Sequence, residues 1–143
     1  MKYENVRNSS KSYVFRKKVP AGESGYLDCK LVEHGFIESV RVRFAAGENA
    51  TLQIRPVVII PQEIMIDLLE YADNGEQYVT GDDELVESAV RCEIENKSIL
   101  RVFYENTGGV GTADSFLNVD IGVTYFSVIE PENIIGPNSF LKG

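Results

Sequence analysis

Alternation of large apolar and polar side chains is the feature that most limits what this chain can fold into. It is clearest over residues 117–125, where Leu, Val, Ile, Val and Tyr alternate with Asn, Asp, Gly and Thr. A period of two residues is typical of a strand that buries one face and exposes the other. The segment therefore predicts a half-buried β-strand.

Similar alternation recurs along most of the chain between short turn sequences. It is visible in residues 13–19, 26–32, 36–44, 51–60, 86–94 and 100–104, with turns such as 21–25 and 46–49 between them. Seven to nine short strands and no predicted helix indicate an all-β fold, a two-sheet antiparallel sandwich of jelly-roll or Greek-key type. An up-and-down barrel is the alternative.

Residues 51–80 depart from this simple pattern. Pro56 cannot donate to a ladder, so we expect its strand to lie at a sheet edge or to be bulged there. The run Val57–Ile60 is apolar on both faces, which indicates a cover from another layer or another subunit. Residues 61–80 fit either a short helix or a strand, and we expect a strand or an irregular segment.

The 143 residues suffice for one domain without disulfide support. We expect a polar N-terminal arm at 1–11, a sandwich domain at 12–129 and an extended tail at 130–143. An extended apolar tail is stable only against a partner surface, so we expect a homo-oligomer or contacts with other proteins of an assembly. The predicted interface residues are Val57, Ile59, Ile134, Ile135, Phe140 and Leu141.

Charge and hydropathy restrict the partners. The formal net charge of −8 disfavours binding to phosphate backbones, so nucleic acid is not an expected partner. No apolar run approaches the ~18 residues of a membrane-spanning helix, and the N-terminus has no secretory signal pattern. We therefore expect neither a membrane partner nor export by a signal peptide.

The two cysteines share the phase of the apolar residues on their strands. Cys29 is in phase with Leu27 and Leu31, and Cys92 with Val90 and Ile94. Two reduced core thiols are favoured over a disulfide between facing strands.

No residue pattern indicates catalysis, and we expect a protein that is not an enzyme. The one histidine, His34, precedes Gly35 in a predicted turn, and no serine lies in a nucleophile-elbow sequence. Most carboxylates fall in turns or on the wet faces of strands, and the chain has no Trp to line a sugar-cleaving cleft. We assign no catalytic residues.

Acidic turns form one candidate metal site. Asp73, Asn74 and Glu76 lie close in sequence to Asp82 and Asp83, and calcium prefers oxygen ligands of this kind. Neither segment matches an EF-hand loop, so solvated turn residues are the alternative. No other cofactor is expected.

Several aromatic residues fall outside the predicted core phase or in loops. They are Tyr26, Tyr71, Tyr78, Phe103 and Phe126. Exposed aromatics can stack on sugar rings or become buried at subunit contacts. Ordinary packing on the second face of a sheet is the alternative.

The segments 77–84 (QYVTGDDE) and 98–107 (SILRVFYENT), followed by the last alternating strand, resemble small β-sandwich structural proteins of tailed bacteriophages and prophages. The resemblance implies a non-enzymatic virion component, such as a capsid decoration, fibre or tail accessory protein, located in the virion or the host bacterial cytoplasm. The overall pattern also resembles carbohydrate-binding jelly-roll modules. The absence of Trp places that function, with a glycan as partner, second.

Overall fold

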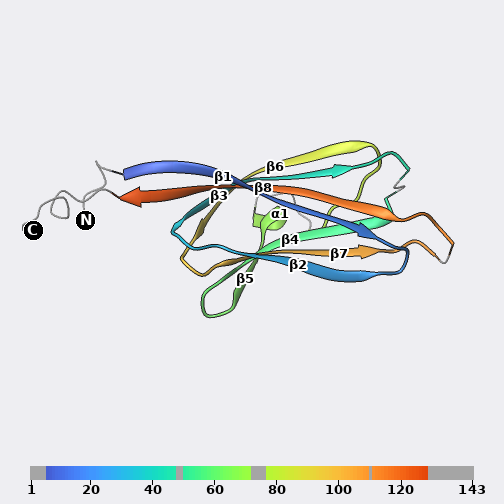
Figure 1. Cartoon of the computed structure of the whole chain (residues 1–143), viewed down its shortest axis with the longest axis horizontal. Helices are drawn as coiled ribbons and strands as arrows, with labels where there is room; N and C mark the ends of the chain where they lie inside the picture. The colour runs from blue at the N-terminus through green and yellow to red at the C-terminus, as the bar shows by residue number, and fades with distance from the viewer. Residues whose placement is uncertain (1–5, 48–49, 72–76, 110, 129–143) are drawn as a thin grey trace, which may run out of the picture.

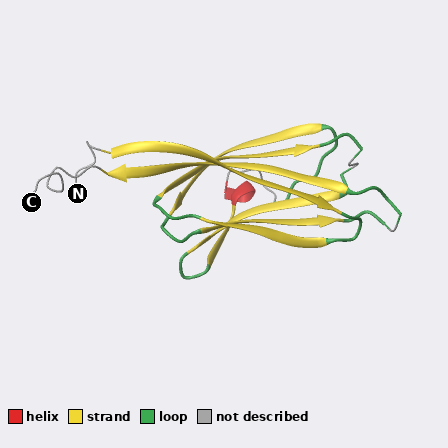
Figure 2. Ribbon diagram, in the orientation of Figure 1, coloured by secondary structure: helices red, strands yellow, loops and turns green. Residues whose placement is uncertain are grey.

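A computed structural model describes residues 6–47, 50–71, 77–109 and 111–128. Two four-stranded antiparallel sheets face each other in this part of the chain (Figures 1 and 2). The first sheet contains, in spatial order, β1 (Val6–Val19), β8 (Ser115–Val128), β3 (Gly35–Phe44) and β6 (Glu84–Ile94). The second contains β2 (Ser24–Lys30), β7 (Ile99–Asn106), β4 (Leu52–Ile60) and β5 (Ile64–Asp67).

Strand pairing is nested along the chain. Strand β1 pairs with β8, β2 with β7, β3 with β6, and β4 with β5. Two further pairs, β3 with β8 and β4 with β7, join these four pairs into two sheets. The predicted all-β antiparallel sandwich is confirmed. An up-and-down barrel is excluded, because only one of the six pairs joins strands that are consecutive in sequence.

The core lies between the sheets, where the alternating apolar residues meet. Leu117, Val119, Ile121 and Val123 of β8 are all buried, as their period predicts. The largest fully buried side chain is Phe44, at the end of β3. The core therefore follows directly from the period-2 pattern.

A one-turn helix, α1 (Leu68–Tyr71), differs from the expectation of no helix. It follows β5 and contacts β4 of one sheet and β6 of the other, where Figure 2 shows it between the layers. Leu68 and Leu69 are both buried. The turn of helix therefore closes the core at one edge, a role that local sequence pattern could not reveal.

Strand β1 begins earlier than the expected sandwich boundary at residue 12. Residues 6–11, expected in a polar arm, pair in register with 123–128 of β8. Backbone hydrogen bonds to β8 require no apolar side chains, which is why the polar sequence concealed the strand. Pairing of β3 with β8 stops at Tyr125, so β1 and β8 continue beyond it as a two-stranded ribbon (Figure 1). The expected tail at 130–143 lies outside the described residues.

Pro56 is accommodated without loss of a ladder bond. Strand β4 lies between β7 and β5, but β5 pairs only from Val57 onward. Ile54 exchanges both backbone bonds with Val79 on that same side. Since residues two apart point the same way, Pro56 faces the gap between Val79 and β5. The strand is thus edge-like at this one residue.

Both cysteines are free and point toward the core, Cys92 buried and Cys29 partly buried. Burial raises the pKa of each thiol, and the nearby Lys11 partly offsets this at Cys29. Each thiol therefore has a higher pKa in the folded than in the unfolded protein. Its contribution to stability is complete at a pH below the unfolded pKa and is lost as pH rises through the folded pKa.

We expect both thiols to react with iodoacetamide much more slowly in the folded protein than in urea. The midpoint of the increase in rate with pH should lie above the ordinary thiol pKa of about 8.5, because the thiolate is the reactive form and burial raises the pKa of both thiols. Mass spectrometry of timed samples measures each cysteine separately. A thiol that reacts equally fast with and without urea would contradict its buried position.

Candidate functional site

The outer face of the sheet β2-β7-β4-β5 carries the candidate site. Strand register arranges its outward side chains in rows that cross the sheet. At one end are Lys30, Ile99, Ile59 and Met65; next come Asp28, Arg101, Val57 and Asp67; then Tyr26, Phe103 and Arg55; and at the other end Ser24, Glu105 and Gln53. The face thus passes from an aliphatic row through an ionic band to an aromatic and polar region.

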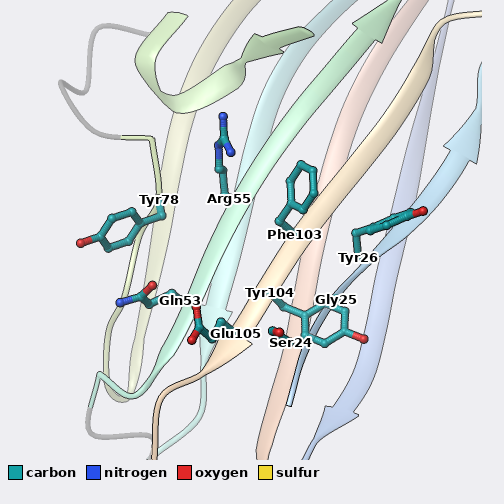
Figure 3. Close-up of a pocket in the computed structure, with 9 residues that line it drawn as sticks. All are labelled: Ser24, Gly25, Tyr26, Gln53, Arg55, Tyr78, Phe103, Tyr104 and Glu105. Atoms are coloured by element: carbon teal, nitrogen blue, oxygen red, sulfur yellow. The ribbon is translucent and has the colours of Figure 1, made fainter. Parts of the chain in front are cut away.

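The aromatic region surrounds a shallow pocket of about 400 Å³, which we call the aromatic pocket. Figure 3 shows Tyr26 and Tyr78 on opposite sides of it, with Phe103 and Arg55 between them. The Tyr26 and Phe103 rings meet edge to face with centroids 5.7 Å apart. The lining residues are Ser24, Gly25, Tyr26, Gln53, Arg55, Tyr78, Phe103, Tyr104 and Glu105.

Segment 77–80 adds one wall of this pocket although it belongs to no sheet strand. Val79 and Ile54 exchange two backbone hydrogen bonds of 2.9 and 3.0 Å. Because Ile54 faces the core, this bridge places the preceding Tyr78 on the outer face, beside Gln53 and Arg55. Tyr78 remains 44% exposed.

Two arginines connect the pocket to the ionic band. Arg101 donates to both carboxylate oxygens of Asp28 at 2.7 and 2.8 Å, and its guanidinium lies 3.9 Å from the Tyr26 ring centroid. Arg55 donates likewise to Asp67 at 2.5 and 3.0 Å, and lies 5.5 Å from the Phe103 centroid. These hydrogen bonds raise the pKa of both guanidinium groups.

The paired arginines therefore hold the aromatic rings in place, and their charges are matched within the sheet. Both pairs are bidentate, which fixes the orientation of each guanidinium as well as its position. Exposed pairs of this kind contribute little to stability, so their main effect here is geometric.

The ionic band also explains why one residue of the run Val57–Ile60, which is apolar on both faces, is covered on its outer side. Val57 is opposite Arg101 on one side and Asp67 on the other, and it is 0% exposed. Its own chain already covers it. Ile59 is half-buried and lies in the aliphatic row with Ile99 and the exposed Met65.

The remaining predicted interface residues, Ile134, Ile135, Phe140 and Leu141, lie outside the described residues. An intersubunit role for the six predicted positions, which also include Val57 and Ile59, stays a prediction.

The predicted calcium ligands are only partly within the described chain. Asp73, Asn74 and Glu76 lie outside it. The Asp82 carboxylate accepts a 2.8 Å hydrogen bond from the Gly47 backbone, and Asp83 has a positive φ of 50° in the same turn. In the described ranges, no three His, Cys, Asp or Glu side chains are grouped as metal ligands. Calcium binding stays a prediction.

Other sequence candidates lie apart from the pocket. The His34 side chain is exposed in the loop between β2 and β3. Phe126 packs against Phe36 at a centroid distance of 5.6 Å on the other sheet. The Tyr71 side chain lies outside the described residues. Three of the five predicted surface aromatics, Tyr26, Tyr78 and Phe103, are therefore brought together.

The sheet β1-β8-β3-β6 also carries a hollow on its outer face. This hollow is smaller, about 120 Å³, and is lined by Arg16, Arg41, Arg43, Leu85, Asn118 and Asp120. Arg41 pairs with Glu87 at 2.9 Å. This hollow lacks the aromatic rings that distinguish the first pocket.

Sequence reasoning missed the polar members of the aromatic pocket. Gln53, Arg55 and Glu105 were not singled out, because no sequence spacing relates β4 to β7. The one available signal was their phase, because all three alternate with core residues and must face outward. Only the strand register places them beside the aromatic residues.

In the described residues, the chain is a nested, eight-stranded antiparallel sandwich with an aromatic pocket on one outer face. No protein-family model matches the chain, and no curated protein matches it by sequence. No helix in the described part of the chain is long and apolar enough to cross a membrane.

Solved structures with a similar fold come from infectious bursal disease virus. The VP2 subviral particle aligns with 87% of this chain at 11% identity and a TM-score of 0.52, and the Gx strain structure with 90% at 10% and 0.52. A structure of the T13 viral particle aligns with 85% at 13% identity and 0.50. This chain spans about one third of each of those chains (33%, 33% and 31%). At these identities the likeness concerns the fold.

Proposed function

We propose that this chain is a non-enzymatic structural component of a phage or prophage particle and functions as an oligomer. The observation that carries the proposal is the nested pairing 1-8, 2-7, 3-6 and 4-5. Eight strands nested in this way form a jelly roll, an architecture used by viral capsid domains. The likeness to VP2, solved as a subviral particle, supports this role. A capsid decoration, a fibre or a tail accessory are the specific roles we propose.

The aliphatic row offers a surface for assembly. Ile59 and Ile99 are half-buried neighbours in register, and Met65 beside them is 46% exposed. Apolar residues at the centre of a patch are typical of subunit contacts. We propose that this row, together with the tail residues Ile134, Ile135, Phe140 and Leu141, forms the intersubunit contact.

We expect the purified full chain to be an oligomer and Met65→Lys to weaken it about 10- to 100-fold in dissociation constant, because a charge would be buried in the contact. Multi-angle light scattering over a concentration series measures the mass. Val14→Lys is the matched control, since Val14 is 49% exposed but lies on β1 of the other sheet. Deletion of 130–143 should also loosen the oligomer. A monomer at every concentration would contradict assembly.

The virion role has a separate test. Particles are purified by density gradient from a culture that expresses the chain, and an antibody against the chain is applied with gold labelling for electron microscopy. We expect gold on the particles at a defined position. A chain that stays in the soluble fraction and labels no particle would contradict the virion role.

A further inference from the structure

We propose that the aromatic pocket binds a neutral carbohydrate, which stacks on Tyr26 and Tyr78 and accepts or donates hydrogen bonds at Gln53 and Glu105. This function goes beyond assembly, and it uses the opposite end of the sheet from the aliphatic row.

Ring positions provide the first part of the argument. Tyr26 and Tyr78 are 51% and 44% exposed and flank the pocket, while Phe103 is half-buried between them. Sugar rings present apolar C–H faces that pack well on exposed aromatic rings. Arg101 over Tyr26 and Arg55 over Phe103 hold the rings before any ligand arrives, which reduces the ordering cost of binding.

Unused hydrogen-bonding groups provide the second part. Ser24, Glu105 and Gln53 form one row beside the aromatic rings. Within the described chain, no side-chain hydrogen bond involves Gln53 or Glu105. The planar amide of Gln53 and the planar carboxylate of Glu105 can each hydrogen-bond two adjacent hydroxyl groups of a sugar. The pocket therefore combines stacking surfaces with donors and acceptors on one side.

Charge and size indicate the class of sugar. Arg55 in the pocket pairs with Asp67, and Arg101 beside the pocket pairs with Asp28, so both positive charges are already matched. Glu105 is acidic, and the whole chain has a formal charge of −8. Acidic sugars and phosphates are therefore disfavoured. A volume of about 400 Å³ is within the usual range for small-ligand pockets, roughly 300 to 1,000 Å³, and suits a short oligosaccharide end.

The first experiment applies the full chain to an array of neutral oligosaccharides built from glucose, galactose, mannose and N-acetylglucosamine, with sialylated and sulfated glycans beside them. Binding to at least one neutral group is expected. Absence of binding, or binding to the acidic glycans alone, would overturn the proposal. Calorimetry with a neutral oligosaccharide that binds then gives the affinity per site, independent of oligomeric state.

Variants then locate the site. Tyr78→Ala and Gln53→Ala should each lower the affinity about tenfold, because each removes one of the two kinds of contact. Tyr78 lies outside the sheet strands, so its replacement should leave the circular dichroism spectrum unchanged. Phe116→Ala is the matched control, since Phe116 is an exposed aromatic residue on β8 of the other sheet.

Full affinity in both variants would overturn the assignment of the pocket. A Tyr78→Ala variant that changes the mass in light scattering, while the parent binds no glycan, would show instead that the pocket is a protein contact. Met65→Lys should retain glycan affinity, so failure of the assembly proposal and failure of this one are distinguishable.

Discussion

Replacement of Gly35 by alanine is expected to lower the free energy of unfolding by about 3 kcal/mol, toward the upper end of single substitutions. Gly35 begins β3 and lies directly between Tyr125 of β8 and Ile94 of β6. A Cβ at this position would lie 2.1 Å from the Thr124 carbonyl oxygen and 2.9 Å from the Tyr125 Cα. Both are backbone atoms, so relief requires the two strands to separate.

Urea unfolding followed by circular dichroism measures this loss. Gly109→Ala is the matched control, because a Cβ there meets no atom within 4 Å. The control should change stability by less than about 0.5 kcal/mol. Equal stabilities for the two variants would contradict the close approach of β3 and β8 at Gly35.

Asn106→Asp should cost about 2 to 4 kcal/mol at pH 7, although the two side chains have nearly the same shape. Asn106 is 1% exposed at the end of β7. Its Nδ2 donates to the Val19 carbonyl at 3.0 Å, and its Oδ1 accepts from the Gly108 N–H at 2.9 Å. An aspartate keeps the hydrogen bond from the Gly108 N–H but places a carboxylate oxygen against the Val19 carbonyl oxygen.

The penalty in Asn106→Asp should depend on pH. Burial and the facing carbonyl favour the protonated acid, so the folded pKa of the new carboxyl lies above the unfolded value of about 3.9. Stability is therefore highest below pH 4 and is lost as pH rises through the folded pKa. Urea unfolding of variant and parent at pH 4 and pH 7 measures the difference. A pH-independent difference would contradict this account of the Asn106 environment.

The local sequence pattern predicted most of the strands and the buried face of each. Strands with one wet face, such as 117–125 and 36–44, are visible because alternation of apolar side chains is dictated by the pleat itself. The structure of two segments was not predicted. Residues 6–11 form a polar strand that pairs through its backbone, and residues 68–71 form a helical turn fixed by core packing. Local sequence contains neither of these tertiary causes.

The candidate surface shows the same division. Strand phase or a position in a loop indicated that Tyr26, Tyr78 and Phe103 lie outside the core, and the apolar run Val57–Ile60 indicated that both of its faces are covered. Register then decided that the aromatic residues form one pocket, and that Arg101 and Asp67 flank Val57 while Ile59 lies in an open aliphatic row.

The sequence by itself determined which side of each strand is buried, because burial follows the two-residue period. It also determined the acidic charge that disfavours nucleic acid as a partner. Only the tertiary structure decided which strands are neighbours, since nested pairing joins residues as distant as Val6 and Val128. The pocket exists for that reason: it gathers side chains from β2, β4, β7 and segment 77–80, which meet only when the sheets are formed.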